Sequence, residues 1–346
     1  MKAFQDIEAV EVANEDRIAP ASVLSIPRDT MGANVVDGIY AANESRFIEA
    51  TFSEPLTAFA VGYQDPGQLQ ELIDFIAPAV PSTRRFEYAL ATNAEEFQAE
   101  TNNDDVRGIG AEFKRVEYTS HKAVGQTLNK GLTIRVDLDN VEDMPMWEQI
   151  YTARLMRRLL RAEALRAYSV LAALGTATPL IWNGTAGLDP DQDIANLVIS
   201  YADSCGMNPT RVLYGIGAWN ARRQAHRAQN TAGGFASAQQ TIDEVATAVG
   251  VDEGFVSRER YSTSLTAKSR IIPNSVLIYL ANANQSPEDA SNIKRFISNT
   301  QGGTPFRVFR QQVNAKLVDI TVEHYSNILA TATLGVQIAN ISSVQN

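Results

Sequence analysis

The sequence predicts an α+β protein, and three observations support this fold class. Alternating polar and apolar stretches within 83–137 predict strands, separated by a turn-rich segment. A long amphipathic helix is predicted to follow over 144–174. Helix-like and strand-like stretches are mixed over 176–303, and alternating strands close the chain after Pro305. The chain has 346 residues, 45% of them hydrophobic, which is enough for one large or two modest domains.

Residues 1–60 predict an extended N-terminal arm. They contain ten acidic and four basic side chains, three prolines and little sustained periodicity. Compact domains seldom contain so long an irregular stretch unless it is disordered or functional. We therefore expect the arm to become ordered by lying across a neighbouring subunit. Directly after it, apolar residues recur at helical spacing and predict a short helix over 68–77.

The segment 83–137 predicts a long two-stranded projection. Apolar residues alternate with polar ones at its two ends, over 86–90 and 132–136. The turn-rich "TNNDDVRGIG" and a strand-like "EFKRVEYT" lie between them. A two-stranded ribbon is not stable alone in water, so we expect another copy of the chain to cover it. Ion pairs between copies are predicted at seven charged residues: Arg84, Arg85, Glu87, Asp104, Asp105, Lys114 and Arg115.

The helix predicted over 144–174 has one apolar face and one arginine-rich face. Asp143, before Pro145, is its expected start, and Gly175 is its expected stop. Glu163 falls on the apolar face, so we expect it to be buried beside a partner, with an arginine the favoured choice. Helical geometry gathers four arginines on the opposite side: Arg154, Arg157, Arg158 and Arg161. Such a face indicates contact with a polyanion, contact with acidic groups of a neighbouring subunit, or an ordinary solvated side of a helix.

The mixed region predicts three helices, two strands and one loop. Asp189 is the expected cap of a helix at "DPDQDIANLVISYADSCG", with Pro190 in its first position. Further helices are predicted at "GAWNARRQAHRAQ" and at "SAQQTIDEVATAVG", which ends at Gly250. The stretches "RVLYG" and "SVLIYL" predict strands, and "NANQSPEDASN" predicts a surface loop. In the closing strands, apolar and polar residues alternate over 318–323, which assigns them to opposite faces.

No motif predicts a catalytic, cofactor-binding or metal site. The three histidines lie far apart in sequence, and none has the spacing of a zinc motif. The acids of "DPDQD" alternate as in a calcium loop, but helix capping explains them better because the required glycine and final glutamate are missing. "YGIGAWN" lacks the third glycine of a dinucleotide-binding turn, and neither a P-loop nor a nucleophile elbow is present. The sequence therefore predicts a protein that is not an enzyme and has no cofactor.

Charge and cysteine content restrict the setting and the partners. The net charge of -10 argues against a surface that binds nucleic acid throughout, so any such contact would be local. Cys205 is the single cysteine, so no intrachain disulfide is predicted and a cytoplasmic setting is the default. The sequence begins without a secretory signal and contains no apolar run near the roughly 20 residues that span a bilayer.

The order of these elements resembles the major capsid proteins of tailed bacteriophages, which have the Hong Kong 97-type fold. The stretches that support the resemblance follow one another in the same order: "TRRFEYALATNAEEF", "LNKGLTIRVD", "PMWEQIYTARLMRRLLRAEALRAYSVL", "NPTRVLYGIGAWNARRQAHR" and "FRVFRQQVNAKLVDITVEHYS". The resemblance covers nearly the whole chain. It is one of layout, because the family has no invariant short motif.

The resemblance implies a division of the chain into named parts. Residues 1–60 would be the N-terminal arm, 83–137 the extended loop with its β-hairpin, and 144–174 the spine helix. Residues 186–303 would be an axial domain around the capsomer axes. Three segments would form a peripheral domain with the spine helix: 61–82, 138–185 and 304–346. Some family members form covalent cross-links through a lysine, but nothing singles out a partner for Lys122 or Lys130, so we predict none.

The resemblance also implies a function. The chain would self-assemble into hexamers and pentamers of an icosahedral phage head that encloses double-stranded DNA. Its partners would be copies of itself, scaffold, portal and decoration proteins, and packaged DNA by non-specific contact, without a membrane. It would reside in the virion after assembly in the host cytoplasm. Three alternatives remain open: an encapsulin-like compartment, a nucleic-acid-binding protein using the arginine face, and an enzyme whose site the motifs do not reveal.

Overall fold

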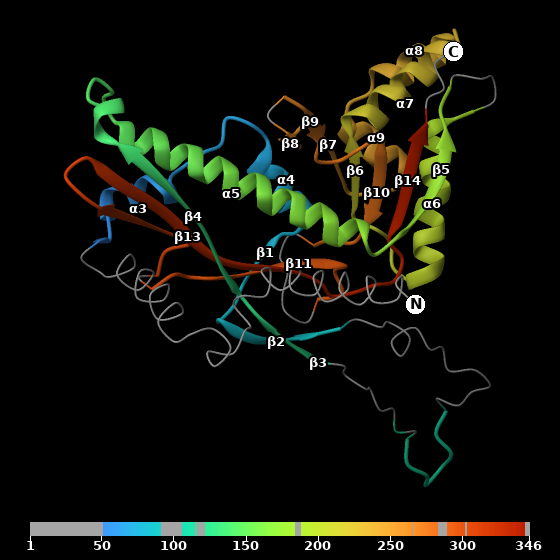
Figure 1. Cartoon of the computed structure of the whole chain (residues 1–346). Helices are drawn as coiled ribbons and strands as arrows, with labels where there is room; N and C mark the ends of the chain where they lie inside the picture. Colours follow the sequence, from blue (N-terminus) through green and yellow to red (C-terminus); the bar gives the residue numbers. More distant parts are fainter. Residues whose placement is uncertain are drawn as a thin grey trace, which may run out of the picture.

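The main body consists of two five-stranded sheets with helices packed against them (Figure 1). The structure is a computed structural model, and it describes these residues: 51–90, 106–113, 115, 122–183, 188–264, 266–282, 289–301 and 303–342. The predicted mixture of helices and strands is confirmed. Among the helices in this described part, none is both long and apolar enough to cross a lipid bilayer.

The first sheet is built around one long strand, β13 (Leu317–Ala330). β13 pairs antiparallel with β11 (Ile293–Ser298), β12 (Phe306–Gln312) and β4 (Leu128–Asp137), and β1 (Ala79–Pro81) pairs parallel with β11. The pairing of β13 with β4 runs over the whole of β4. The end of the predicted projection therefore belongs to the main sheet, and the projection is shorter than 83–137.

Both faces of β13 are covered. Its apolar face packs in a core with two helices, α3 and α5, as the alternation predicts. The polar side chains on the other face are also buried, and the neighbouring strand β4 supplies hydrogen-bond partners for them. Arg135 donates two hydrogen bonds to the Asp319 carboxylate, at 2.8 and 2.9 Å. The hydroxyls of Thr133 and Thr321 lie 2.8 Å apart.

The second sheet has the strand order β5-β14-β10-β6-β7. Its central strands β10 (Ser275–Tyr279) and β6 (Arg211–Gly215) are buried at every residue, which explains their apolar sequences. β14 (Gln337–Ser342) and β5 (Thr176–Ile181) extend one side, and β7 (Glu253–Ser257) is the other edge. Outside the two large sheets, β8 (Arg260–Ser262) pairs with β9 (Lys268–Arg270), a second pair of strands forms a hairpin described below, and Leu138–Asn140 forms a 3-10 turn.

Helices α6 (Pro190–Cys205), α7 (Ile216–Ala228) and α9 (Ile242–Val249) cover the second sheet. Asp189 caps α6 as predicted, since its side chain accepts a hydrogen bond from the Asp191 backbone. The sequence predicts a single helix over 237–250, and this prediction is wrong in its first part. Helix α8 (Ala232–Gln239) ends at Gln239, and Thr241 then begins α9 with a capping box. Gly250, with φ of 83°, ends α9 as predicted.

Residues 282–292, predicted as a surface loop, are described only at their ends. Ser291 and Asn292 are buried there, so the prediction is wrong for these two residues. The Asn292 side chain accepts hydrogen bonds from the Tyr201 hydroxyl and from the Leu280 backbone, each at 2.8 Å. A polar side chain is stable at this buried position because its hydrogen bonds are made within the chain.

Helix α5 (Trp147–Ala172) is the predicted long helix and lies along the first sheet. Its apolar face is buried as expected. It begins after Met146, which has a positive φ of 56°, and the predicted cap at Asp143 is wrong. Gly175, the predicted stop, lies beyond the C-cap Ala173 and does not itself end the helix. A glycine is needed there because a Cβ would lie 2.6 Å from the Val336 carbonyl oxygen. The short helix predicted over 68–77 is α4 (Leu69–Ile76).

The last ten residues of the predicted arm are not irregular. Residues 1–50 lie outside the described part, but α3 (Glu54–Val61) follows directly. Pro55 occupies its first turn, where a missing N–H costs nothing, so the proline starts a helix here. Leu56 and Ala60 then enter the same core as α5 and β13.

The two sheets cross the predicted domain boundaries. β11 lies within 186–303, the predicted axial domain, yet it pairs in the first sheet with β13. β14 lies within 304–346 and pairs in the second sheet with β10 and β5. The predicted division already joins three separate segments in the peripheral domain, but it does not exchange β11 and β14 between the two sheets, because those pairings depend on strands that are distant in sequence.

Candidate functional site

A short hairpin forms the root of the projecting loop. Strands β2 (Arg85–Ala89) and β3 (Lys122–Gln126) pair antiparallel. Phe86 stacks on Phe296 of β11 with ring centroids 4.1 Å apart, and Tyr88 lies 5.5 Å from the same ring. Arg84 lies over the Tyr325 ring of β13 at 4.6 Å. These contacts fasten the root of the loop to the first sheet.

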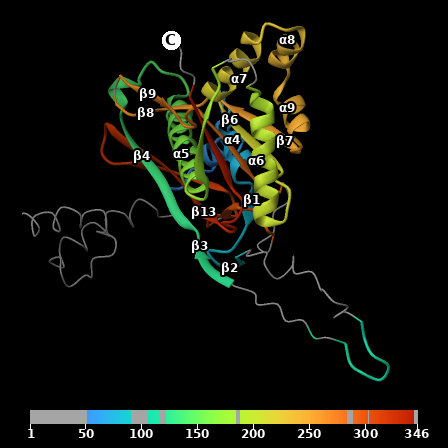
Figure 2. The ribbon, with the colours of Figure 1, turned by 90° about the vertical axis from the view of Figure 1, so that its right-hand side faces the viewer.

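The described tip of the loop, residues 106–113, lies apart from the main body (Figures 1 and 2). Three apolar residues of the tip are exposed: Val106 at 69%, Ile109 at 108% and Phe113 at 72%. The Arg107 guanidinium lies 5.1 Å from the Phe113 ring centroid. The sequence predicts turns up to Gly110 and a strand-like piece from Glu112, and neither prediction identifies an apolar tip. The available signal was the recurrence of apolar residues at 106, 109 and 113 in a segment otherwise rich in glycine and charge.

The seven residues predicted to form ion pairs between copies are only partly described. Arg84, Arg85 and Glu87 are exposed at the loop root, and Arg115 is exposed near the tip. Asp104, Asp105 and Lys114 lie outside the described residues. The Arg84 guanidinium lies over the Tyr325 ring of its own chain, and the side chain stays exposed to solvent. Their pairing with another copy stays a prediction.

The arginine face of α5 is partly engaged by its own chain. Arg157 donates a hydrogen bond to the Tyr63 hydroxyl at 2.8 Å and lies 3.7 Å from the Asp65 carboxylate. Arg154 lies over the Tyr151 ring at 4.8 Å. Of the remaining two arginines, Arg158 is exposed and Arg161 is half-buried. The face is therefore less uniform than the helical spacing predicts, which weakens the case for a polyanion site.

Glu163 lies where α5, β4 and β13 meet. It is only 3% exposed, as its place on the apolar face predicts. The Lys130 ammonium donates to both of its carboxylate oxygens at 3.0 Å, and the Ser326 hydroxyl donates to one at 2.6 Å. Arg166 also contacts the carboxylate, so the predicted arginine partner is present. The more deeply buried partner is Lys130, which sequence reasoning did not bring near Glu163.

This cluster shifts the titration of its members. Burial alone raises the pKa of Glu163, but the Lys130 ammonium and the Ser326 hydroxyl outweigh it and hold the pKa below its usual value. Burial lowers the pKa of Lys130, and the facing Glu163 partly offsets this effect. Burial also lowers the pKa of His324 to about 4, so this imidazole is neutral at pH 7. At neutral pH the Glu163 carboxylate therefore faces two cations, Lys130 and Arg166, beside a neutral histidine.

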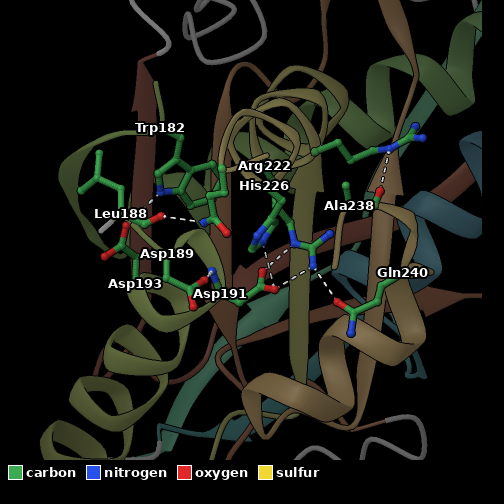
Figure 3. Close-up of polar contacts among 11 residues, drawn as sticks. Trp182, Leu188, Asp189, Asp191, Asp193, Arg222, His226, Ala238 and Gln240 are labelled. Atoms are coloured by element: carbon green, nitrogen blue, oxygen red, sulfur yellow. Dashed lines mark hydrogen bonds and ion pairs between the residues drawn. The ribbon is translucent and has the colours of Figure 1, made fainter. Parts of the chain in front are cut away.

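A second polar cluster joins the helices over the second sheet (Figure 3). Arg222, fully buried on α7, donates to both carboxylate oxygens of Asp191 at 2.5 and 2.7 Å, and to Gln240 at 2.9 Å. His226 Nε2 lies 3.2 Å from Asp191 Oδ2. Within the described part of the chain, Asp189, Asp191 and His226 form a group whose ligand atoms lie within 4.8 Å of one another.

The geometry of this second cluster fits a structural role better than a metal centre. The Arg222 guanidinium already neutralises Asp191, and its positive charge opposes a bound cation. The Asp189 side chain is used to cap α6. The network ties α6 to α7 and to the residue that follows α8. No metal site was predicted here, and the arrangement gives no reason to propose one.

Comparisons with known proteins identify the fold. No protein-family model matches the sequence, and no curated protein matches it significantly. A solved phage-related protein from Bordetella bronchiseptica is 17% identical with a TM-score of 0.61, covering 85% of this chain and 98% of that chain. The capsid of a native GTA particle is 12% identical with a TM-score of 0.51, over 81% of this chain and 92% of that chain. The capsid of cyanophage P-SCSP1u is 7% identical with a TM-score of 0.50, over 78% and 88%.

Proposed function

We propose that this chain, which has the Hong Kong 97-type capsid fold, is the major capsid protein of a phage head. Copies would assemble into hexamers and pentamers and close into an icosahedral shell around double-stranded DNA. The chain would serve as a structural subunit of the shell and not as an enzyme. The structural similarities support the fold. The observation that supports assembly most directly is a projecting loop with an apolar tip that the described part of its own chain does not cover.

The apolar tip calls for a partner. Soluble monomers seldom project large apolar side chains in a group, and such groups mark interaction sites. Ile109 and Phe113 are 108% and 72% exposed on a segment that lies away from the body. A neighbouring copy would remove this surface from water, as in obligate assemblies. The rigid root at Phe86 would hold the loop in the direction required to reach that copy.

The parts of the fold receive their roles within this proposal. The first sheet with α5 would be the peripheral domain and spine, and the second sheet with α6, α7, α8 and α9 would be the axial domain near the capsomer axes. Residues 1–50 would cross a neighbouring copy as an arm. Seven charged residues of the loop would pair between copies: Arg84, Arg85, Glu87, Asp104, Asp105, Lys114 and Arg115.

The proposal gives DNA only a loose contact with the shell. The net charge of -10 disfavours a strongly basic lining, which would hold DNA too tightly for release. Arg157 is also engaged by its own chain through Tyr63, so the arginine face is not a free polycationic stripe. Contact between shell and DNA would be non-specific and weak.

Electron microscopy of the purified protein tests the proposal. We expect closed shells or capsomer rings, whereas dispersed monomers under all assembly conditions would refute it. The contents of particles from the native host test the finer statement. Nuclease-resistant DNA inside them is expected for a phage head. A captured enzyme in place of DNA would replace this function with that of an encapsulin-like compartment.

A further inference from the structure

We propose that the loop tip, residues 106–113, of one copy docks on a second copy at the N-terminal end of α5. The receiving surface, named here the end surface, consists of Asp139, Glu142, Asp143, Met146, Trp147 and Ile150. The inference rests on the proposed function, because it names the surface with which the projecting loop makes contact. Apolar exposure, hollows, charge and geometry support it.

The end surface exposes apolar side chains, as the tip does. Met146, directly before α5, is 71% exposed, and Ile150, in the first turn of the helix, is 38% exposed. Trp147, half-buried between them, contacts Tyr151 with ring centroids 6.3 Å apart. Two surfaces that each expose apolar groups gain free energy by covering each other. The tip offers Ile109 and Phe113 for this contact.

Two hollows flank Trp147. One, of about 360 Å³, is lined by the first residue of the helix, Trp147, and by five residues that precede it: Leu138, Asp139, Val141, Glu142 and Met144. The other, of about 320 Å³, lies between α3 and α5 and includes Pro55 and Met146. A cavity of about 150 Å³ admits a benzene ring, so either hollow has room for the Phe113 side chain.

The charges of the two surfaces are complementary. Asp139, Glu142 and Asp143 are exposed on the end surface. Lys316 pairs with Asp139 at 2.6 Å, so two acids remain for a partner. The sequence from 106 to 115 has three basic residues against the single acid Glu112. Arg107, held against the Phe113 ring, would reach the acidic rim as that ring enters a hollow.

The two surfaces lie at opposite ends of the molecule (Figure 1). The end surface is at the start of α5, and the tip projects beyond the hairpin of β2 and β3 on the other side. A chain therefore does not place its own tip on its own end surface. Contact between two different surfaces of identical copies is heterologous, and it generates closed rings when the rotation permits. This is the geometry that a ring of capsomer subunits requires.

Disulfide trapping between two differently tagged chains tests the docking. An Ala111→Cys chain, which keeps Phe113, is mixed with a Glu142→Cys chain and mildly oxidised, and a cross-linked heterodimer is expected because Ala111 is an exposed residue of the tip. The native Cys205 is buried, so its background reaction is low. The matched control replaces Glu142→Cys by Asp252→Cys, an exposed acid of the region that carries the second sheet. Cross-linking that is absent, or equal to that of the control, overturns the docking.

Charge exchange provides a second test. Arg107→Glu and Glu142→Arg should each lower the yield of shells severalfold, because each places like charges together. The double variant should recover the yield, since the pair is restored with reversed sign. A double variant no better than the single variants contradicts the docking. Wild-type chains that form no shells contradict the proposed function instead, and the disulfide assay still reports directly whether the two surfaces meet.

Discussion

Glu163 is a carboxylate in the middle of an apolar helix face, and its neighbours explain how the fold tolerates it. Lys130 and Ser326 satisfy its oxygens at 3.0 and 2.6 Å. The sequence predicts its burial and the need for a partner, because helical spacing places it among leucines. It does not predict Lys130, since that contact depends on the register of β4 against β13.

Removing the Glu163 carboxylate should strand the buried Lys130 ammonium. Glu163→Ala is expected to lower the free energy of unfolding by about 3 to 5 kcal/mol, the usual cost of breaking a buried pair from one side. Urea unfolding followed by tryptophan fluorescence measures it. The control is the double variant Lys130→Met with Glu163→Met, which should recover much of the loss because no charge is stranded. A single variant as stable as wild type would mean that the pair faces water.

His324 should make stability depend on pH between its unfolded and folded pKa values. Burial lowers the pKa from 6.5 to about 4, partly offset by Glu163, while Lys130, Arg166 and Arg295 add to the lowering. The unfolded chain therefore binds a proton first as the pH falls. The free energy of unfolding should decrease between pH 6.5 and 4, by about 3 kcal/mol for this group.

Glu163 acts in the same direction at lower pH. Its pKa is depressed in the folded state, so its contribution is present above the unfolded pKa and is lost as the pH falls through the folded value. Urea titrations at a series of pH values measure the combined slope. His324→Gln should flatten it between pH 6.5 and 4, whereas an unchanged slope in this variant would exclude His324 as the source.

Among the elements, those with a strong local period are the ones that sequence predicts. α4, α5 and α6 show apolar residues at helical spacing and are found within three residues of the predicted bounds. α3 was missed because its first turn contains a proline and its burial depends on β12. The two sheets could not be delimited, since β11 and β14 join strands that are distant in sequence.

The hairpin of β2 and β3 depends on aromatic packing for its orientation. Phe86→Ala removes the stacking partner of the fully buried Phe296. Because Phe86 is only half-buried, we expect a loss of about 2 kcal/mol in the free energy of unfolding, below the cost of truncating a fully buried phenylalanine. Shell yield should fall further than stability does, since the loop is misdirected. Unfolding curves and particle counts by electron microscopy measure the two effects, and normal yield would contradict a directing role.

Charge reversal at the loop root separates assembly from folding. The double variant Arg84→Glu with Arg85→Glu should impair shell formation, because both side chains are exposed and proposed to meet acids of another copy. The fold should persist, since losing the contact of Arg84 with Tyr325 costs only about 0.5 to 1 kcal/mol. Circular dichroism and electron microscopy report the two effects. The matched control reverses Arg258 and Arg260, also exposed, and should assemble; normal shells from the first variant would refute the pairing.

At the scale of the whole molecule, the order of arm, loop, long helix and closing strands resembles that of the capsid family, and the structural similarities support the fold that this resemblance implies. The candidate contact surfaces were not predicted in the same way. The apolar tip is visible in sequence only as Ile109 and Phe113 among glycines and charges. The hollows that flank the end surface bring together residues before α5 and residues of α3, and only the folded chain shows that these segments meet.

A cryo-electron microscopy reconstruction of the assembled protein tests the central claim most directly. The account predicts a closed shell in which residues 106–113 of each copy lie against a neighbouring copy, with Phe113 removed from water. Loops that fold back onto their own chain and touch no neighbour would contradict it, as would a protein that remains monomeric at every concentration.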